Sequence, residues 1–185
     1  MIKNFFLTIL MLNIIVTSTS AQTNSNYLLW NAEHKLTADD FLIKTKELET
    51  SASHVQFSID YQVGGFDFFA RNFNKRIKNN FIKSASWIDT TIDFSQTLIY
   101  QQTLFNICEI YARQFRKALK ENKKKLLNGM AILQQLNEQF TSDFSKRRID
   151  YDKETKSGSN ELMQKKWEFQ IQKELTELGN FSYDK

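Results

Sequence analysis

The spacing of apolar and polar positions divides the chain into three parts. An apolar run with one asparagine occupies residues 5–16, and an alternation with a period of two follows over 55–63. After Asp93 the apolar residues recur every three or four positions, which is the period of an amphipathic helix. Strands that precede a group of helices are typical of an α+β fold.

Residues 1–21 have the pattern of a secretory signal peptide. Lys3 supplies the basic start, an apolar run of 12 residues follows, and small residues stand at Thr19 and Ala21. We expect cleavage between Ala21 and Gln22. The alternative is a membrane anchor, but a spanning helix needs about 20 apolar residues. The sequence therefore predicts a secreted or periplasmic bacterial protein with no membrane span after cleavage.

The remainder is expected to form one domain. Residues 22–29 are expected to be a flexible leader, and 30–185 contain enough apolar residues for a single core. Near the start of this domain, Thr37 is placed to cap a short helical turn that ends at Phe41.

The first half of the domain predicts a small antiparallel sheet. The alternation over 55–63 is followed by Gly64-Gly65, after which 66–70 alternates again. Two such runs around a Gly-Gly link predict a β-hairpin. We expect the basic, asparagine-rich stretch 72–83 to be a loop and 86–88 to be a short strand.

The second half predicts one long helix and two further helices. The long helix has an acidic cap and a glutamine three residues later, at Asp93 and Gln96, and is expected to end near Asn128. The third helix is expected to begin near Asn160, after a polar turn over 151–158. The apolar stripes are Leu98, Phe105, Cys108, Ala112, Phe115 and Leu119 in the first helix; Leu133, Leu136, Phe140 and Phe144 in the second; and Leu162, Met163, Trp167, Ile171, Leu175 and Leu178 in the third.

The small number of cysteines and histidines limits the disulfides and metal sites that the chain can form. One cysteine and two histidines exclude an intramolecular disulfide and any Cys₄, Cys₂His₂ or His₃ zinc site. Cys108 lies in the apolar stripe and is expected to be a buried, unreactive thiol. His34 and His54 have no ligand spacing, and a zinc site that adds Glu33 or Asp60 to them is disfavoured.

The formal charge of +4 is spread among interspersed acidic residues. Nucleic-acid binding would need a basic face with interleaved aromatic residues, so it is not expected. Attraction to an anionic envelope surface fits the charge better, although it is unspecific.

The long helix carries the most informative segment, LIYQQTLFNICEIYARQFRKAL at 98–119. It resembles the motif helix of a family of secreted bacterial proteins, domain of unknown function 922, which are zincin-like metallopeptidases. The segments at 30–41, 86–88, 151–158 and Trp167 are similar to further motifs of that family, in the same order. The resemblance spans about residues 30–175 and implies a zincin-like fold.

In that family the helix carries an H-E-x-x-H motif, whose histidines bind zinc while the glutamate is the general base. The motif is replaced here by Tyr100-Gln101-Gln102-Thr103-Leu104. By this resemblance, Tyr100 and Leu104 occupy the two histidine positions, Gln101 the glutamate position, and Ser157 the position of a third ligand. Leucine cannot bind a metal and glutamine cannot act as a base. The resemblance therefore implies a degenerate site, without zinc or another cofactor.

We therefore expect a pseudo-metallopeptidase, more a binding protein than an enzyme. A zincin-type cleft can hold a peptide as an added strand through backbone hydrogen bonds, which need no metal. Two alternatives remain open at this point: a hydrolase with a shifted site, and a helical protein that interacts with envelope proteins.

Overall fold

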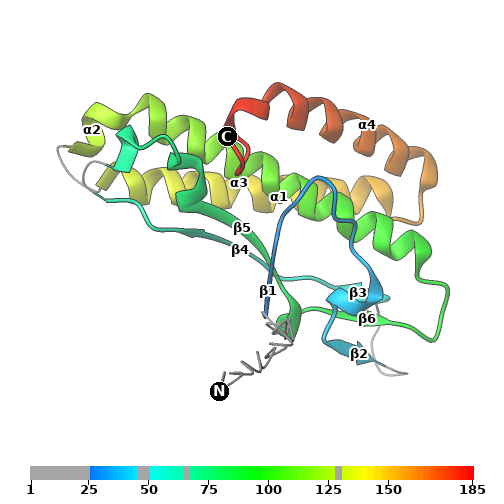
Figure 1. The fold of residues 1–185 in the computed structure, drawn as a ribbon. Helices are drawn as coiled ribbons and strands as arrows, with labels where there is room; N and C mark the ends of the chain where they lie inside the picture. The colour runs from blue at the N-terminus through cyan, green and yellow to red at the C-terminus, as the bar shows by residue number, and fades with distance from the viewer. Residues whose placement is uncertain (1–25, 46–50, 65–66, 128–130) are drawn as a thin grey trace, which may run out of the picture.

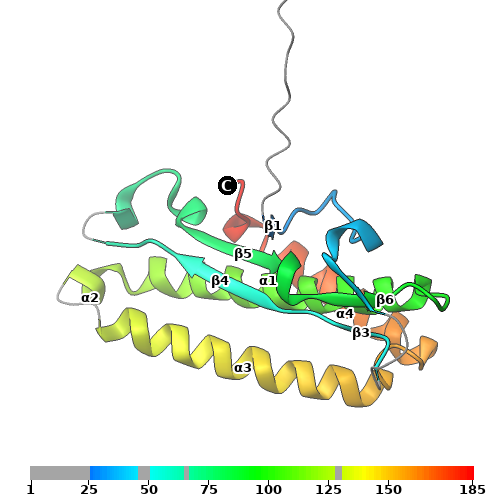
Figure 2. The same ribbon diagram turned by 90° about the horizontal axis from the view of Figure 1, so that it is seen from below.

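The computed structural model describes residues 26–45, 51–64, 67–127 and 131–185. The expected signal peptide and its cleavage site at Ala21–Gln22 lie outside the described residues. Figures 1 and 2 show the described part as long helices lying side by side, with the strands on one side of the central helix.

The strands form two three-stranded sheets. The first sheet is antiparallel and has the order β1-β5-β4, with β1 at Tyr27–Leu29, β5 at Ile77–Ile82 and β4 at Phe57–Tyr61. The second has the order β2-β6-β3, with β2 at Ile43–Thr45 parallel to β6 at Trp87–Asp89, and β3 at Ser53–His54 antiparallel to β6. The strand expected over 86–88 is thus confirmed as β6.

Three long helices carry most of the second half, as expected. They are α1 (Ser95–Glu121), α3 (Ala131–Thr155) and α4 (Glu161–Glu177), and the short α2 (Lys123–Leu127) lies between the first two. Five 3₁₀ turns complete the described elements: η1 (Ala38–Asp40), η2 (Asp67–Phe69), η3 (Phe73–Arg76), η4 (Lys83–Ala85) and η5 (Gly179–Phe181). The α+β class is confirmed.

Helix α1 lies at the centre of the fold. It contacts α3, α4 and strand β5, and its apolar stripe is buried between them. Phe105 stacks on Phe57 of β4 with ring centroids 5.3 Å apart, and Phe115 meets Phe140 of α3 at 6.0 Å. No described helix is both long and apolar enough to cross a membrane.

The expected hairpin is wrong. β4 pairs with β5, so Phe57 lies opposite Phe81 and Tyr61 opposite Ile77. The stretch expected to be a loop therefore contains the central strand of the sheet. Its asparagines mislead because Asn79 is fully buried and donates from its side-chain amide to the carbonyl of Phe105 and to Glu109.

The connection between β4 and β5 holds itself together with polar contacts. Asp67 accepts a hydrogen bond from the backbone N–H of Gly64 and forms an ion pair with Arg76 at 3.3 Å. Residues 67–69 consequently form the 3₁₀ turn η2, where a second hairpin strand was expected.

The leader is also shorter than expected. Tyr27–Leu29 form β1, whose backbone pairs with β5, and Trp30 is buried and donates from its backbone to the carbonyl of Asn79. By contrast, the expected turn at Thr37 is confirmed, since the N–H and hydroxyl of Thr37 both donate to Asp40.

Both ends of α1 differ from the expectation. Phe94, not Asp93, is the N-cap of α1, and Gln96 donates to the carbonyl of Gly158 instead of closing a capping box. α1 ends at Glu121, and α2 begins after Asn122. The expected start of the last helix is confirmed, because Asn160 caps α4 by accepting the N–H of Met163.

Helix α3 continues to Thr155, so most of the expected turn over 151–158 is helical. Tyr151 and Thr155 extend the buried stripe of Phe144 at helical spacing, and both are fully buried. The helix stops where Lys156 and Ser157 adopt positive φ angles of 49° and 54°.

A buried charge cluster joins α1 to the sheet and to the C-terminal segment. Glu109 pairs with Arg113 at 3.0 Å and with Arg116 at 2.8 Å, and all three side chains are buried. Arg116 also donates to the carbonyls of Ile77 and Phe181. One carboxylate thus compensates two guanidinium groups, and backbone carbonyls supply the remaining acceptors.

Candidate functional site

The four positions singled out by the resemblance lie on the N-terminal half of α1 and on the turn after α3. Three of them belong to Tyr100, Gln101 and Leu104 on α1, and all three side chains are buried. The fourth, Ser157, is exposed on the turn that joins α3 to α4.

Tyr100 is fixed by α3. Its hydroxyl donates to Asp152, and its ring stacks on Tyr151 with centroids 5.1 Å apart and planes 11° apart. Burial raises the pKa of the Tyr100 hydroxyl, and the neighbouring Asp152 carboxylate raises it further, while Ser157 opposes the shift by hydrogen bonding. The phenol therefore remains a neutral hydrogen-bond donor.

The turn after α3 packs directly against Tyr100. Gly158 has φ +89°, and a Cβ at this position would lie 2.8 Å from the Cβ of Tyr100. The backbone N–H of Ser157 donates to the carbonyl of Asp152, and that of Gly158 to Thr155 Oγ1. Tyr100 and Ser157, far apart in sequence, are thus brought together.

A hydrogen-bond network closes this region on the side of α4. The Tyr151 hydroxyl donates to Gln164 Oε1 at 2.6 Å, and Gln164 Nε2 donates to Thr103 Oγ1 at 3.0 Å. Burial raises the pKa of Tyr151. No pattern in the sequence indicated Gln164, because its partners Tyr151 and Thr103 lie on two other helices, α3 and α1.

The side chain of Gln101 points towards strand β3. Its Nε2 donates to Ser53 Oγ of β3 at 2.7 Å, while its Oε1 is buried and has no partner among the described residues. Leu104 is completely buried in the core cluster that also contains Tyr100 and Tyr151. An amide, a leucine and a neutral phenol offer neither a metal-ligand set nor a general base.

The histidines and the cysteine have other roles. His34 Nε2 lies 3.0 Å from Asp40, and His54 belongs to the two-residue strand β3. Burial raises the pKa of the Cys108 thiol, which disfavours a reactive thiolate. Within the described ranges, no group of three or more His, Cys, Asp or Glu side chains is placed to hold a metal ion.

Two cavities that the sequence did not indicate lie beside α1. One, of about 520 Å³, lies between β4 and α3. The other, of about 590 Å³, lies between α1 and α4. The alternation over 55–63 predicted a half-buried strand, but the cavity beside it depends on where α3, much later in the chain, is placed, and periodicity does not encode that placement.

Comparison with known proteins adds no further constraint: no protein-family profile, curated protein or solved structure matches this chain significantly. The resemblance to the zincin-like family therefore stays a prediction based on the motifs quoted above.

Proposed function

We propose that this chain is a secreted, non-catalytic relative of the zincin-like metallopeptidases that binds an extended peptide along the free edge of β4. The observation that carries the proposal is the juxtaposition of that edge with the cavity next to α3. The degenerate motif positions support the non-catalytic part of the proposal, because Tyr100, Gln101 and Leu104 supply neither a zinc-ligand set nor a general base next to the cleft.

The edge of β4 offers backbone groups for an added strand. The carbonyl of Gln56 accepts the N–H of Ile82, and the N–H of Gln62 donates to the carbonyl of Arg76. In an antiparallel pair, alternate residues bond to the partner strand. Residues 56, 58, 60 and 62 therefore face β5, and Phe57, Ile59 and Tyr61 direct their backbone groups away from it.

The cavity runs along this free edge. It is lined by Phe57, Ile59 and Tyr61 on the strand and by α3 residues on the other side, among them Asn137, Thr141, Ser145, Arg148 and Ile149. Its volume of about 520 Å³ is in the range of ligand-binding clefts. In strand addition, backbone hydrogen bonds give affinity and side-chain pockets give specificity.

The cleft also leads towards the degenerate motif. Arg148 lines the cavity, and its Nε lies 3.9 Å from Asp152, which accepts the hydroxyl of Tyr100. Cys108, which also lines the cavity, follows Leu104 by one helical turn on α1. A bound peptide would thus pass close to the positions that carry the zinc ligands in the family that the sequence resembles.

Strand addition can be tested with peptides. A binding peptide would first be selected from a random library on the mature chain, and single N-methyl groups would then be placed along it. We expect N-methylation to abolish binding at every second residue, because alternate N–H groups face β4. An effect at every position, or at none, would contradict strand addition.

A matched pair of variants locates the peptide. Ser145→Arg places a large side chain in the cleft, whereas Ser142→Arg makes the same change at an exposed α3 residue outside the cavity lining. We expect only Ser145→Arg to weaken the selected peptide, by about tenfold or more. Equal effects of the two would place the peptide elsewhere.

The ancestral relationship has a separate test. The variant Tyr100→His, Gln101→Glu, Leu104→His and Ser157→His restores the motif, and we expect it to bind zinc stoichiometrically while the parent does not. Since histidine at the buried position 104 can prevent folding, the double variant Tyr100→His, Ser157→His is measured in parallel. It should gain weaker zinc affinity, and failure of both folded variants would refute the mapping.

A further inference from the structure

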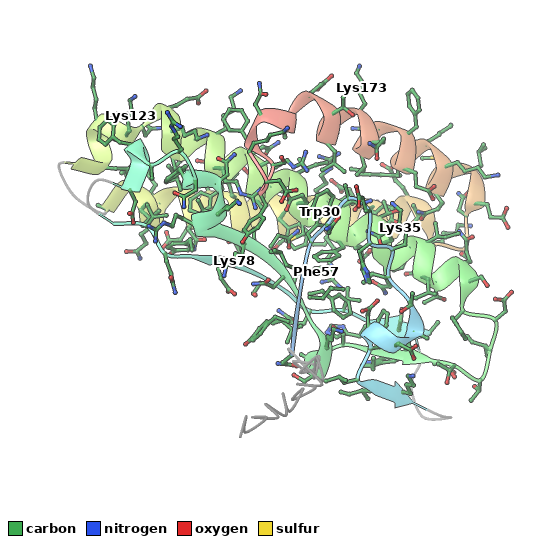
Figure 3. The ribbon with its side chains drawn as sticks, viewed as in Figure 1. Trp30, Lys35, Phe57, Lys78, Lys123 and Lys173 are labelled. Carbon is green, nitrogen blue, oxygen red and sulfur yellow. The ribbon has the colours of Figure 1, made fainter. Side chains whose placement is uncertain are left out.

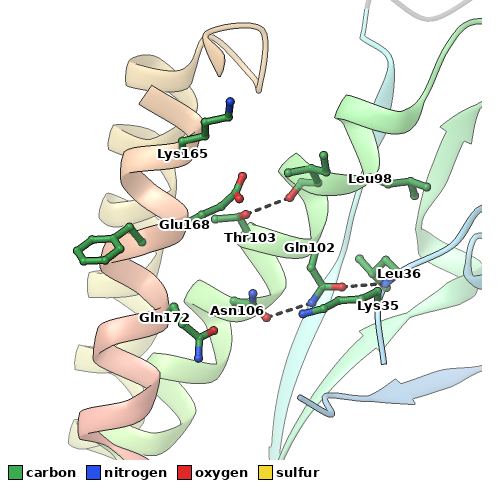
Figure 4. A pocket seen from close by; sticks show the side chains of 11 residues that line it. Lys35, Leu36, Leu98, Gln102, Thr103, Asn106, Lys165, Glu168 and Gln172 are labelled. Carbon is green, nitrogen blue, oxygen red and sulfur yellow. Dashed lines mark hydrogen bonds between the residues drawn. The ribbon is translucent and has the colours of Figure 1, made fainter. Parts of the chain in front are cut away.

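The cavity between α1 and α4 is a groove with an apolar half. Leu36, Leu98, Ile99 and Phe169 line it, together with Gln102 and other polar side chains (Figure 4). Two of these apolar residues are well exposed, Ile99 at 43% and Phe169 at 77%. The groove follows α1 from Leu98 to Asn106, which is about 12 Å at the helical rise of 1.5 Å per residue.

The opposite half of the groove presents hydrogen-bond donors. A second cavity of about 170 Å³ is also lined by Lys35, Asn106 and Gln172, so it adjoins the first at these residues. Figure 4 shows Lys35 and Gln172 directed towards Asn106 from opposite sides. Lys35 has no ion-pair partner in the part of the chain that the structure describes.

The orientation of Asn106 is fixed by its neighbours. Its Oδ1 accepts two hydrogen bonds, from Trp30 Nε1 at 2.9 Å and from Gln102 Nε2 at 3.0 Å. The Oε1 of Gln102 in turn accepts the backbone N–H of Leu36 at 2.8 Å. Because these bonds occupy the carbonyl oxygens, the amide group of Asn106 is left to donate into the groove.

The buried charge cluster makes this end of the groove positive. Glu109 compensates both Arg113 and Arg116, so the cluster retains one positive charge in excess. Arg113 is 5% exposed and lines the second cavity. Its buried charge adds to that of the exposed Lys35, and both attract an anion to this end of the groove.

The groove is also lined by one carboxylate, that of Glu168, which lies towards the apolar half (Figure 4). Glu168 accepts a hydrogen bond from Gln164 Nε2 at 2.9 Å, one turn nearer the start of α4, and Lys165 follows on the same side (Figure 4). The formal charges of Lys165 and Glu168 sum to zero at the apolar half. The groove thus pairs an apolar wall with a cationic, donor-rich end.

We propose that this groove binds a linear aliphatic carboxylate of medium chain length. The carboxylate accepts hydrogen bonds from Lys35, Asn106 and Gln172 and is attracted by Arg113. The alkyl chain lies along Leu98, Ile99 and Phe169. This site is separate from the edge of β4, so the inference stands whether or not a peptide binds there.

The test uses decanoate as the probe, measured by calorimetry on the mature chain. Decanol has the same tail without the charge, and acetate has the charge without the tail. We expect saturable binding of decanoate at one site per chain, with decanol and acetate each weaker by tenfold or more. Equal binding of decanol, or no saturable binding of decanoate, would overturn the proposal.

A pair of charge variants places the ligand. Lys35→Gln removes the charge and leaves a polar side chain that is one atom shorter. Lys173→Gln makes the same change on α4, at a residue that is 69% exposed and paired with Glu177 (Figure 3). We expect Lys35→Gln to weaken decanoate about tenfold, the loss of one charge-assisted hydrogen bond, and Lys173→Gln to have no effect. If both variants bind decanoate as the parent does, the groove is not the site.

Discussion

The surface of α1 around Tyr100 and Leu104 is filled more completely than its surface along α4. On the first side, Tyr100 is enclosed by Tyr151, Asp152 and the turn at Gly158, and Leu104 is completely buried in the same core cluster. On the side of α4, the helix borders a groove of about 590 Å³. The two positions that the resemblance assigns to zinc ligands on α1, Tyr100 and Leu104, are therefore buried, whereas Gln102 and Thr103 between them border the groove.

Under the proposed relationship to the zincin-like peptidases, this packing is how a site would lose its reaction and keep its scaffold. An empty metal site would leave polar groups buried without partners, which destabilises a fold. Here the aromatic ring of Tyr100 and the side chain of Leu104 fill that region with packed, bonded atoms. Gln101 is the exception, since its Oε1 remains buried and unpaired among the described residues.

The largest expected difference between the two sides comes from one substitution made on each. Leu104→Ala opens a cavity in a fully buried position and should cost about 3 kcal/mol of unfolding free energy. Leu98→Ala, on the half-buried wall of the groove, should cost about 1 kcal/mol or less. Denaturant unfolding of both variants measures the contrast; equal losses would mean that the groove is as tightly packed as the core.

A smaller effect is expected at the turn that closes the filled side. Gly158→Ala should cost about 2 kcal/mol, because the residue has φ +89° and its Cβ would meet Tyr100. Gly179→Ala is the control, since a Cβ there meets no atom within 4 Å. Thermal unfolding should show a clear loss for the first only. If Gly158→Ala is neutral, the turn does not hold Tyr100 in place.

The smallest effect at neutral pH is expected for the hydroxyl groups of the closed side. Tyr151→Phe removes the hydrogen bond to Gln164 and should cost about 1 kcal/mol at pH 7. Tyr100→Phe removes the bond to Asp152 and should cost a similar amount.

The same two variants have a signature in alkali. The pKa values of Tyr100 and Tyr151 are raised in the folded chain, so above about pH 10 the unfolded chain releases these protons first. Stability should therefore fall as the pH rises above 10, and each phenylalanine variant should flatten that slope. An unchanged slope in both variants would show that neither hydroxyl is held in its neutral form.

The fold was predictable where a residue's neighbours in sequence determine its environment. The helical stripe around Phe105 and Phe115, the cap at Asn160 and the strand at Trp87 all follow from local spacing. The central strand β5 could not be predicted in this way. Asparagine is common in loops, so Asn79 favoured a loop at this position. Its burial becomes favourable only because its side-chain amide donates to the carbonyl of Phe105 and the carboxylate of Glu109, both on α1.

The site was predictable to a similar extent. The order of motifs in the sequence anticipated that the turn at Ser157 would approach Tyr100, and the geometry brings them together. Neither groove could be anticipated. Lys35, Asn106 and Gln172 belong to segments about 70 residues apart, and each one separately has the pattern of an ordinary surface residue.

The contacts of Arg116 impose an order on the folding of the chain. Its guanidinium is completely buried and donates hydrogen bonds to the carbonyl of Ile77, the carboxylate of Glu109 and the carbonyl of Phe181. The first two lie on β5 and α1, but the carbonyl of Phe181 belongs to η5, which follows α4. Until η5 docks on α1, a charged group in the middle of the protein lacks one of its acceptors. The centre of the fold is therefore completed by a segment that adds no apolar side chain to it and gives Arg116 only the oxygen of one peptide bond.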